Sequence, residues 1–389
     1  MKRFSTPAGV CGLTRHEQKF HQELLTFARE VIGPRAAQID AAQEIPAAVL
    51  ADLAQRGYFG ANVAAEYGGT PLSSIKLGLL HHAIGTVSSS VRSVLTAHGM
   101  VCEVLQRWGS VAQKDVWLRR LATGQTTAAF ALSEPQAGSD WHATECAAVS
   151  NGELYALSGA KRWITAGQFA GLFLVIAKND GLPAPFLVSR DSDGLSLSPL
   201  RGQLGLRGAM LASLDLHHCL VAKAHRVGGS GFGGEAVVAC ALDFGRYTVA
   251  WGCAGIGQAC LDASLQHAST RRQGGVLIGE HQLVRAMITD MLAKVRAAGT
   301  LCVHAGRLRG RQDPASVMEV CVAKYAAAKM CAAVSQDAVQ IHGASGCSEG
   351  SLTERHYRDA KIMEIIEGSN QVQQDLIARL AFGYCQHEQ

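Results

Sequence analysis

Residues 357–374 read YRDAKIMEIIEGSNQVQQ, a stretch that places two glutamates, Glu364 and Glu367, three residues apart in an apolar setting. Two isoleucines precede Glu367, and a Gly-Ser pair follows it. Burying a carboxylate among such residues costs free energy unless the group has a partner or a task. A helix N-cap would explain a glutamate beside a Gly-Ser turn, but it does not explain the two isoleucines. The pattern favours a functional role for Glu367 and a structural role for Glu364.

Outward from this stretch, the sequence changes character twice. Residues 14–124 carry apolar residues at helical spacing, and the segment from Pro46 to Gly57 has the start and stop signals of one helix. Residues 126–225 shift to short runs with a period near two, which predicts a small antiparallel barrel or sandwich. Residues 235–381 return to long helices, one of them with a continuous apolar stripe between Val284 and Val295. We expect an α-β-α composite whose two helical parts pack together.

Composition narrows the class of protein. A chain of 389 residues with 48% hydrophobic and 17% charged residues can bury a large core, and a net charge of +4 is too small to favour nucleic acid. No apolar run is long enough for a membrane helix, and no apolar segment before Arg15 indicates a signal peptide. The twelve cysteines include no C-x-x-C pair, so we expect free thiols in a cytoplasmic protein.

Two motifs suggest a dinucleotide site and a metal site, but their context favours neither. The segment GGSGFGG at 228–234 formally contains G-x-G-x-x-G, but it lacks a βαβ unit and a following acidic residue. We interpret it as a flexible connection. The pairs His81-His82 and His217-His218 point in diverging directions and have no third ligand nearby, so we predict no metal site.

Two further stretches are more informative. ALSEPQAGSD, residues 131–140, brings small hydroxyl side chains and a flexible backbone to the end of a predicted strand. Such a loop can approach a phosphate or a planar ring closely, although an ordinary turn has a similar composition. In KRWITAG, residues 161–167, we expect Trp163 and Thr165 on the same side of one strand. They would offer an aromatic wall and a hydroxyl in one place.

Together these segments resemble the acyl-CoA dehydrogenase family, over nearly the whole chain from residue 20 to residue 381. ALSEPQAGSD is like the family's T/S-E-P-x-A-G-S-D loop, and KRWITAG is like its W-I-T strand. TRRQGGVLIGEHQ (270–282) is similar to the R-x-x-F-G…Q segment, and QIHGASG (340–346) to the Q-x-x-G-G-x-G turn. The opening stretch is similar to the R-D-A…E-G-T/S-x-x-Q signature. Five ordered blocks make this a specific resemblance.

The resemblance implies an α+β fold with three domains. We expect an N-terminal helical domain at 1–124, a central β-barrel or sandwich at 125–228, and a C-terminal four-helix bundle at 229–389. It also implies FAD as cofactor, an acyl thioester as substrate, an unidentified electron acceptor and a homo-oligomer, either a dimer or a tetramer.

The family's site residues carry over position by position. Glu367 stands at the catalytic base, which removes the α-proton of the thioester while FAD accepts a hydride from the β-carbon. The residues expected to line the flavin, with Thr165 near its N5 edge, are Phe130, Leu132, Ser133, Trp163 and Thr165. Those expected to contact the rest of FAD, some from a neighbouring subunit, are Arg271, Gln282, Gln340, Gly343, Ser369 and Gln371. Those expected on the substrate side are Ser139, Asp243, Arg246 and Gly368.

Three departures from the family pattern bear on cofactor and substrate. Gly274 replaces the usual phenylalanine of R-x-x-F-G, so we expect an adenine-side contact to be lost or replaced. Ala344 replaces the second glycine of the G-G turn. Ile366 replaces the aromatic residue that often precedes the base, which disfavours a fatty acyl substrate.

A narrower resemblance involves SSSVRSVLTAHGM, FGRYTVAWGCAGIGQAC and YRDAKIMEIIEGS. These segments are similar to the dehydrogenases of hydroxymalonyl- and methoxymalonyl-carrier-protein pathways in polyketide biosynthesis, which implies a small polar acyl group on an acyl carrier protein. The alternatives are a short-chain acyl-CoA dehydrogenase and a non-catalytic scaffold with a flavin fold. Candidate docking points for an acidic carrier are Arg119-Arg120, Arg271-Arg272 and Arg307–Arg311.

Overall fold

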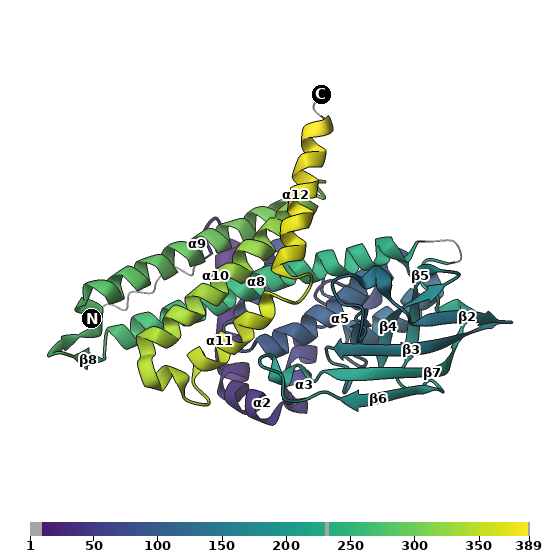
Figure 1. Cartoon of the computed structure of the whole chain (residues 1–389), viewed down its shortest axis with the longest axis horizontal. Coiled ribbons are helices and arrows are strands. Elements are labelled where there is room, and N and C mark those ends of the chain that lie inside the picture. Colours follow the sequence, from purple (N-terminus) through teal and green to yellow (C-terminus); the bar gives the residue numbers. More distant parts are fainter. Residues whose placement is uncertain (1–9, 230–232, 388–389) are drawn as a thin grey trace.

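The computed structural model describes residues 10–229 and 233–387, and it confirms the expected order of helices, strands and helices (Figure 1). The N-terminal part contains α1 (Arg15–Phe27), α2 (Ala36–Ala42), α3 (Ala47–Gln55), α4 (Ser74–Gly85), α5 (Ser89–Trp108), α6 (Val111–Gln113) and α7 (Arg119–Ala122). The predicted helix from Pro46 to Gly57 is α3, for which Pro46 is the N-cap and Gly57, with φ +72°, follows the last turn.

The central part is one seven-stranded sheet with the order β1-β4-β2-β3-β7-β6, in which β5 pairs with β4. Its strands are β1 (Ala128–Ala131), β2 (Ala147–Asn151), β3 (Leu154–Ile164), β4 (Leu172–Asn179), β5 (Leu182–Ser189), β6 (Leu195–Pro199) and β7 (Ala212–Ala222). The expectation of a purely antiparallel domain was wrong, since β4 pairs parallel to both β1 and β2. The chain leaves β1, forms the β2–β3 hairpin and returns in β4 beside β1, and this crossover makes the two strands parallel.

The C-terminal part contains α8 (Gly234–Ala268), β8 (Arg272–Gln273), β9 (Val276–Leu277), α9 (Gln282–Gly310), α10 (Ser316–His342), α11 (Leu352–Met363) and α12 (Asn370–His387). Helices α8, α9, α10 and α11 pack together, whereas α12 packs on α10 and projects from the body of the molecule (Figure 1). The predicted apolar stripe lies on α9, where Met291 and Val295 are buried.

The two helical parts share one hydrophobic core, as expected, because α4 and α5 pack against α8. Glycines permit this close approach. A Cβ at Gly78 of α4 would overlap the ring of Trp251, and a Cβ at Gly85 would lie 2.8 Å from the Gly252 carbonyl oxygen. The strands bury a second cluster of apolar side chains between β1 and β7.

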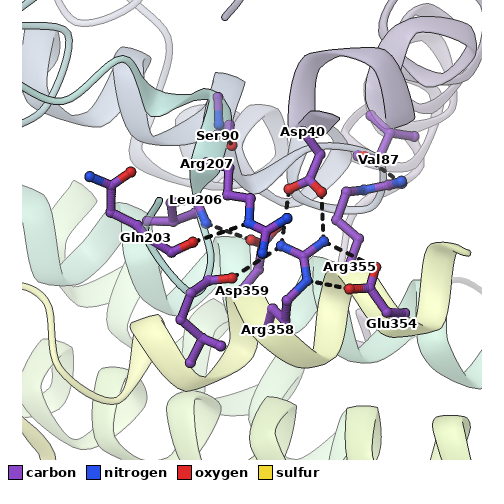
Figure 2. A network of polar contacts seen from close by, with 12 residues as sticks. Asp40, Val87, Ser90, Gln203, Leu206, Arg207, Glu354, Arg355, Arg358 and Asp359 are labelled. Atoms are coloured by element: carbon purple, nitrogen blue, oxygen red, sulfur yellow. Dashed lines mark hydrogen bonds and ion pairs between the residues drawn. The ribbon is translucent and has the colours of Figure 1, made fainter. Parts of the chain in front are cut away.

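A buried polar network joins all three parts of the chain (Figure 2). Arg358 of α11 forms two hydrogen bonds to the carboxylate of Asp40 on α2, at 2.6 and 3.1 Å, and a further ion pair with Glu354. The next residue, Asp359, accepts a bond from the backbone N–H of Leu206, which follows β6 (Figure 2). Gly208 donates its N–H to Ser90 at the start of α5. The R-D-A motif therefore fixes the position of α11 relative to the two other parts.

The predictions for the two ends of the chain and for the glycine-rich segment fall partly outside the described residues. Residues 1–9 and 230–232, which include the chain start and the centre of GGSGFGG, lie outside it. The cysteines within the described residues are free, and most are buried. In the same residues no cluster of three His, Cys, Asp or Glu side chains could hold a metal ion, and no helix is long and apolar enough to cross a membrane.

Candidate active site

Glu367 lies in the turn between α11 and α12, in a backbone conformation that a glutamate rarely adopts. Its φ is +54°, and that of Gly368 is +89°. A left-handed conformation at a residue other than glycine is typical of positions where a side chain is held for function. Ser369 closes the turn by accepting the backbone N–H of Val372, which makes it the N-cap of α12.

The side chain of Glu367 lies against α8 at Gly245. A Cβ at Gly245 would lie 2.5 Å from Glu367 Oε2, so only glycine leaves room for the carboxylate there. Burial raises the pKa of Glu367 from 4.5 to about 7, against the opposing charges of Arg246, Arg92 and Lys324. A carboxyl group with this pKa is a stronger base than a solvated one, and it is ionised in part at neutral pH.

Two cations hold the backbone of this turn. The Arg246 Nε donates to the Glu367 carbonyl oxygen at 3.2 Å, and the fully buried Lys324 Nζ donates to the Gly368 carbonyl oxygen at 2.7 Å. Gln373 also donates to the Glu367 carbonyl. The side chain of Arg246, which we expected on the substrate side, therefore contacts the main chain of Glu367. Gly368, also expected on the substrate side, belongs to the same turn.

The predicted flavin loop begins at the end of β1 and is closed by a buried ion pair. Lys161 Nζ lies 2.6 Å from Glu134 Oε1, and the two side chains are 0% and 1% exposed. Glu134 also accepts bonds from the Thr144 hydroxyl and from the N–H groups of Glu145 and Cys146, while Lys161 donates to the Leu132 carbonyl oxygen at 3.0 Å. Because every partner is satisfied, the loop from 132 to 146 is preorganised.

An exposed aromatic side chain stands beside this loop. Arg162 donates its N–H to the Ser133 carbonyl oxygen, so Ser133 lies next to Trp163. Trp163 has φ +62° and lies at an irregularity in the β3–β7 pairing, and 60% of its surface is exposed. The expectation that Thr165 shares a strand with Trp163 was wrong, because β3 ends at Ile164 and Thr165 belongs to the following turn. The left-handed backbone at Trp163 breaks the strand's alternation.

The aromatic wall and Glu367 are connected through α8. Leu132 packs with Val238 of α8, and the half-buried Phe130 and Leu242 join the same cluster. Leu242 lies less than one turn from Gly245, which contacts Glu367. The turn that contains Thr165 is held by a hydrogen bond from the Ala166 N–H to the Ala209 carbonyl oxygen. The residue before Ala209, Gly208, bonds to Ser90 of α5. Residues far apart in sequence thus surround one region between β1, α5, α8 and the Glu367 turn.

These residues fit the isoalloxazine end of FAD. Trp163 presents an uncovered ring next to a preformed loop with Ser133 and the exposed Ser139, and a planar cofactor is the kind of partner that would cover it. Of the residues expected at the rest of FAD, Ser369 and Gln371 adjoin the Glu367 turn, and the other four lie elsewhere. Arg271 and Gln282 are exposed at the far end of α8 and the start of α9, and Gln340 and Gly343 are exposed at the end of α10. Gln371 is exposed on the first turn of α12.

Asp243, expected on the substrate side, is engaged within the chain. It forms an ion pair with Arg309 of α9, which also lies 3.5 Å from Glu103. Arg307 binds both carboxylate oxygens of Glu17 at 2.6 Å. Two arginines of the expected 307–311 docking cluster are therefore paired with carboxylates of the same chain, and Arg311 is the exposed one.

Sequence reasoning missed Gly245, Lys324 and the Glu134–Lys161 pair. Lys324 had a usable signal, since it is a single charge in the apolar helical run VCVAKYAAA at 320–328. Gly245 had none, because its importance depends on the side chain that faces it from another helix. Glu364, expected to be structural, bonds to Asn370 and Lys361 in the turn.

A carboxylate of raised pKa lies against α8, and a loop with an exposed tryptophan that fits a planar cofactor packs on the same helix. Such a combination is typical of a flavin-dependent oxidoreductase that acts on an activated C–H bond. Family models for acyl-CoA dehydrogenases match three consecutive segments: the N-terminal domain at residues 14–125, the middle domain at 129–219 and the C-terminal domain at 232–382. The chain belongs to the acyl-CoA dehydrogenase family, whose members are FAD-dependent oxidoreductases.

Individual relatives agree with this assignment. The human mitochondrial short-chain specific acyl-CoA dehydrogenase is 32% identical over 369 residues, which cover 92% of this chain and 89% of the relative. The solved structure of FkbI, described as serving biosynthesis of the methoxymalonyl extender unit of the polyketide Fk520, is 36% identical with a TM-score of 0.86 over 92% of this chain and 99% of FkbI. The prolyl acyl carrier protein oxidase AnaB is 25% identical with a TM-score of 0.90 over 95% of this chain and 100% of AnaB.

Proposed function

We propose that this chain oxidises a small acyl thioester, bound to an acyl carrier protein, in polyketide-type secondary metabolism. The observation that carries the chemistry is Glu367, a base with a pKa raised to about 7 by burial, which lies against α8, the helix on which the loop residue Leu132 also packs. The observation that carries the biological setting is the similarity to FkbI and AnaB.

In the proposed reaction, Glu367 removes the α-proton of the thioester, and the hydride leaves the β-carbon. FAD, when bound, supplies the acceptor for that hydride. Arg246 and Lys324 hold the two carbonyl groups of the Glu367 turn, so the carboxylate is kept at one position beside Gly245. Leu132 and Phe130 exclude water from the side of the site next to α8.

Glu367→Gln is the direct test. The change is nearly isosteric and removes only the base, so we expect an unchanged fold and FAD content, and flavin reduction by substrate slowed by about 10²–10⁴-fold or more. Anaerobic mixing of the yellow protein with a panel of thioesters, followed at the flavin absorbance, measures the rate. Glu364→Gln is the matched control and is expected to reduce at near wild-type rate. A Glu367→Gln variant as fast as wild type would assign the base elsewhere.

The alternative function is oxidation of an ordinary short-chain acyl-CoA, which the human relative favours. Ile366, which precedes the base in the sequence and replaces the family's aromatic residue, is half-buried against the main core and disfavours a fatty acyl substrate in either case. The two functions differ outside the pocket, where coenzyme A brings an adenosine phosphate and a carrier brings an acidic protein surface. On this chain the exposed basic residues available to such a surface include Arg120 and Arg311.

We expect catalytic efficiency to be higher on the carrier-bound form of one acyl group than on its coenzyme A form. The advantage should shrink as salt rises from low to physiological ionic strength, because exposed charges are screened beyond a Debye length of about 8–10 Å. Steady-state kinetics with both thioesters of the same acyl group at several salt concentrations measure this. Equal efficiency on both forms at every salt concentration would favour the acyl-CoA alternative.

We also propose that the active form is a homo-oligomer, dimer or tetramer, in which two copies share each FAD. Phe130 packs near Leu242 in the early part of α8, whereas Arg271 follows the end of α8 at Ala268. A helical rise of about 1.5 Å per residue separates these points by roughly 40 Å, far more than one dinucleotide spans. Arg271 and its neighbours therefore serve the cofactor of another copy.

A further inference from the structure

The first turns of α8 carry a row of side chains that leads from the surface to the base. Glu235 and Ala239 are exposed, and Leu242 is half-buried. Arg246, also half-buried, bonds through its Nε to the Glu367 carbonyl oxygen. Residues at this spacing share one side of a helix, and at a rise of about 1.5 Å per residue the row is roughly 16 Å long. Burial increases along the row, which marks an approach to the base along α8.

The loop that follows β1 brings an aromatic surface to the outer end of this row. Trp141 packs on the apolar cluster that contains Val238 of α8, yet it stays only half-buried. The exposed ring of His142 stacks on Trp141, with the two ring centroids 3.8 Å apart. The Nδ1 atom of His142 lies 4.0 Å from Glu235 Oε1, so the loop adjoins the first turn of α8. Part of the indole therefore remains accessible beside the start of the row.

We propose that Trp141 is a specificity-determining residue that contacts the pantoyl end of the pantetheine arm on which the acyl thioester is carried. This inference rests on the proposed function, in which Glu367 acts at the α-carbon next to the thioester. Coenzyme A and an acyl carrier protein present the same arm, so Trp141 serves a substrate from either source.

The length and chemistry of the arm fit this arrangement. From its sulfur to its outermost oxygen the arm has about a dozen bonds and spans roughly 15 Å when extended, which matches the row from Arg246 to Glu235. Its outer end bears two methyl groups on one carbon, and an aromatic face can take such apolar surface out of water. Ala239, in the middle of the row, has a side chain too small to block the arm.

A purely structural role for Trp141 would be to anchor the loop on α8. The two roles differ in what a substitution changes. Loss of an anchor affects the binding of FAD and of every thioester, because the loop itself moves. Loss of a contact with the pantoyl group weakens only those thioesters that possess this group.

The test compares two thioesters of the acyl group that reduces the wild-type flavin fastest. The N-acetylcysteamine thioester ends before the pantoyl group, whereas the pantetheine thioester includes it. Dissociation constants are measured from the flavin absorbance of the FAD-loaded Glu367→Gln protein, in which binding occurs without oxidation. We expect the pantetheine form to bind about tenfold more tightly or better, since its two methyl groups become buried.

In the same background, Trp141→Leu keeps an apolar side chain in the cluster but removes the aromatic face. It should reduce the preference about fivefold or more by weakening the pantetheine form alone, and Trp141→Phe should retain part of it. The coenzyme A and carrier-bound forms should weaken by the same factor as the pantetheine form. Leu182→Ala, which removes an exposed apolar side chain on β5, is the matched control and should change neither affinity.

Equal affinities for the two thioesters, or a preference that survives Trp141→Leu, would overturn the inference. Equal weakening of both thioesters would show an anchoring role, and a loss confined to the coenzyme A form would place Trp141 at the adenosine; either result also overturns it. Should Trp141→Leu not retain FAD, Ala239→Leu narrows the same row with Trp141 intact and must weaken the pantetheine form alone. Flavin reduction by no thioester would refute the proposed function, whereas loss of the pantoyl preference alone refutes only the assignment of Trp141.

Discussion

At the residue scale, the site depends on a carboxylate whose basicity is set by its surroundings. Desolvation raises the pKa of Glu367, while Arg246, Arg92 and Lys324 lower it, and the balance leaves it at about 7. Neither effect alone would serve, since a carboxylate of ordinary pKa is a weak base and a fully desolvated one stays protonated at neutral pH. Gly245 makes this balance possible because it admits the carboxylate against α8.

The raised pKa of Glu367 predicts a pH dependence of flavin reduction. Only the ionised carboxylate accepts the α-proton, and the pKa lies above the ordinary 4.5, so the base is mostly protonated below pH 7. We therefore expect the rate constant to rise about tenfold per pH unit below pH 7 and to level off above it. Stopped-flow reduction between pH 5.5 and 8.5 measures the curve. A rate that is already constant from pH 5.5 upwards would show that the base titrates at its ordinary pKa.

At the element scale, the flavin loop owes its shape to one buried ion pair. Glu134 and Lys161 are fully enclosed, and between them they tie Leu132, Thr144, Glu145 and Cys146 to β3. Burying two charges is costly, so the pair is better understood as a device that fixes one loop conformation than as a source of stability. The loop therefore presents Ser133 next to Trp163 before any cofactor arrives.

Lys161→Met is expected to destabilise the protein by about 3–5 kcal/mol, because it leaves the Glu134 carboxylate buried without its partner. The affinity for FAD should fall with it, since the loop is no longer fixed. Denaturant unfolding and FAD titration measure the two effects. The matched control is Arg162→Met on the same strand, whose ion pair with Asp215 is about 30% exposed and should contribute no more than about 1 kcal/mol.

Adding Glu134→Gln to Lys161→Met should recover part of the lost stability, because the neutral amide carries no buried charge and keeps an acceptor oxygen for Thr144, Glu145 and Cys146. Equal losses for Lys161→Met and Arg162→Met would show that the buried pair does not hold the loop.

The small hairpin β8–β9 explains one departure from the family pattern. Its two-residue turn consists of Gly274 and Gly275, with φ of +61° and +83°. Such a turn requires left-handed backbone at both positions, which phenylalanine adopts only at a cost. The glycine that replaces the usual phenylalanine thus belongs to a tight turn, and this turn cannot offer an aromatic side chain to a cofactor.

At the scale of the whole molecule, the residues predicted to line the flavin lie near the start of α8, whereas Arg271 and Gln282 lie beyond its end. Helix α12 projects from the body (Figure 1). Its Phe382 is 72% exposed. We expect the FAD-loaded protein to sediment as a dimer or tetramer of the 41.1 kDa chain. Arg271→Ala should weaken FAD binding without affecting the flavin-side residues of its own chain. Sedimentation equilibrium measures the mass, and a 41.1 kDa species with FAD fully bound would contradict the shared site.

The order of elements and the base could be predicted from the sequence because both are local signals. Helical and strand periodicity marked α3, β4 and α9 within their own segments, and Glu367 stood out as a charge beside two isoleucines. The same kind of signal was present at Arg92 and Lys324, each of which has no other charged residue within three positions in the sequence, but an isolated charge does not reveal what it faces.

What only the tertiary structure decided is the pairing of distant segments. The parallel pairing of β4 with β1, the contact of Gly245 with Glu367 and the contact of Gly252 with Arg92 join residues that are far apart in the chain. Thr165 left its predicted strand because Trp163 adopts a left-handed backbone, for which the local sequence gives no sign. Local periodicity determines which residues form a helix or strand. The pKa of Glu367, in contrast, is set by burial and by cations that lie on other helices.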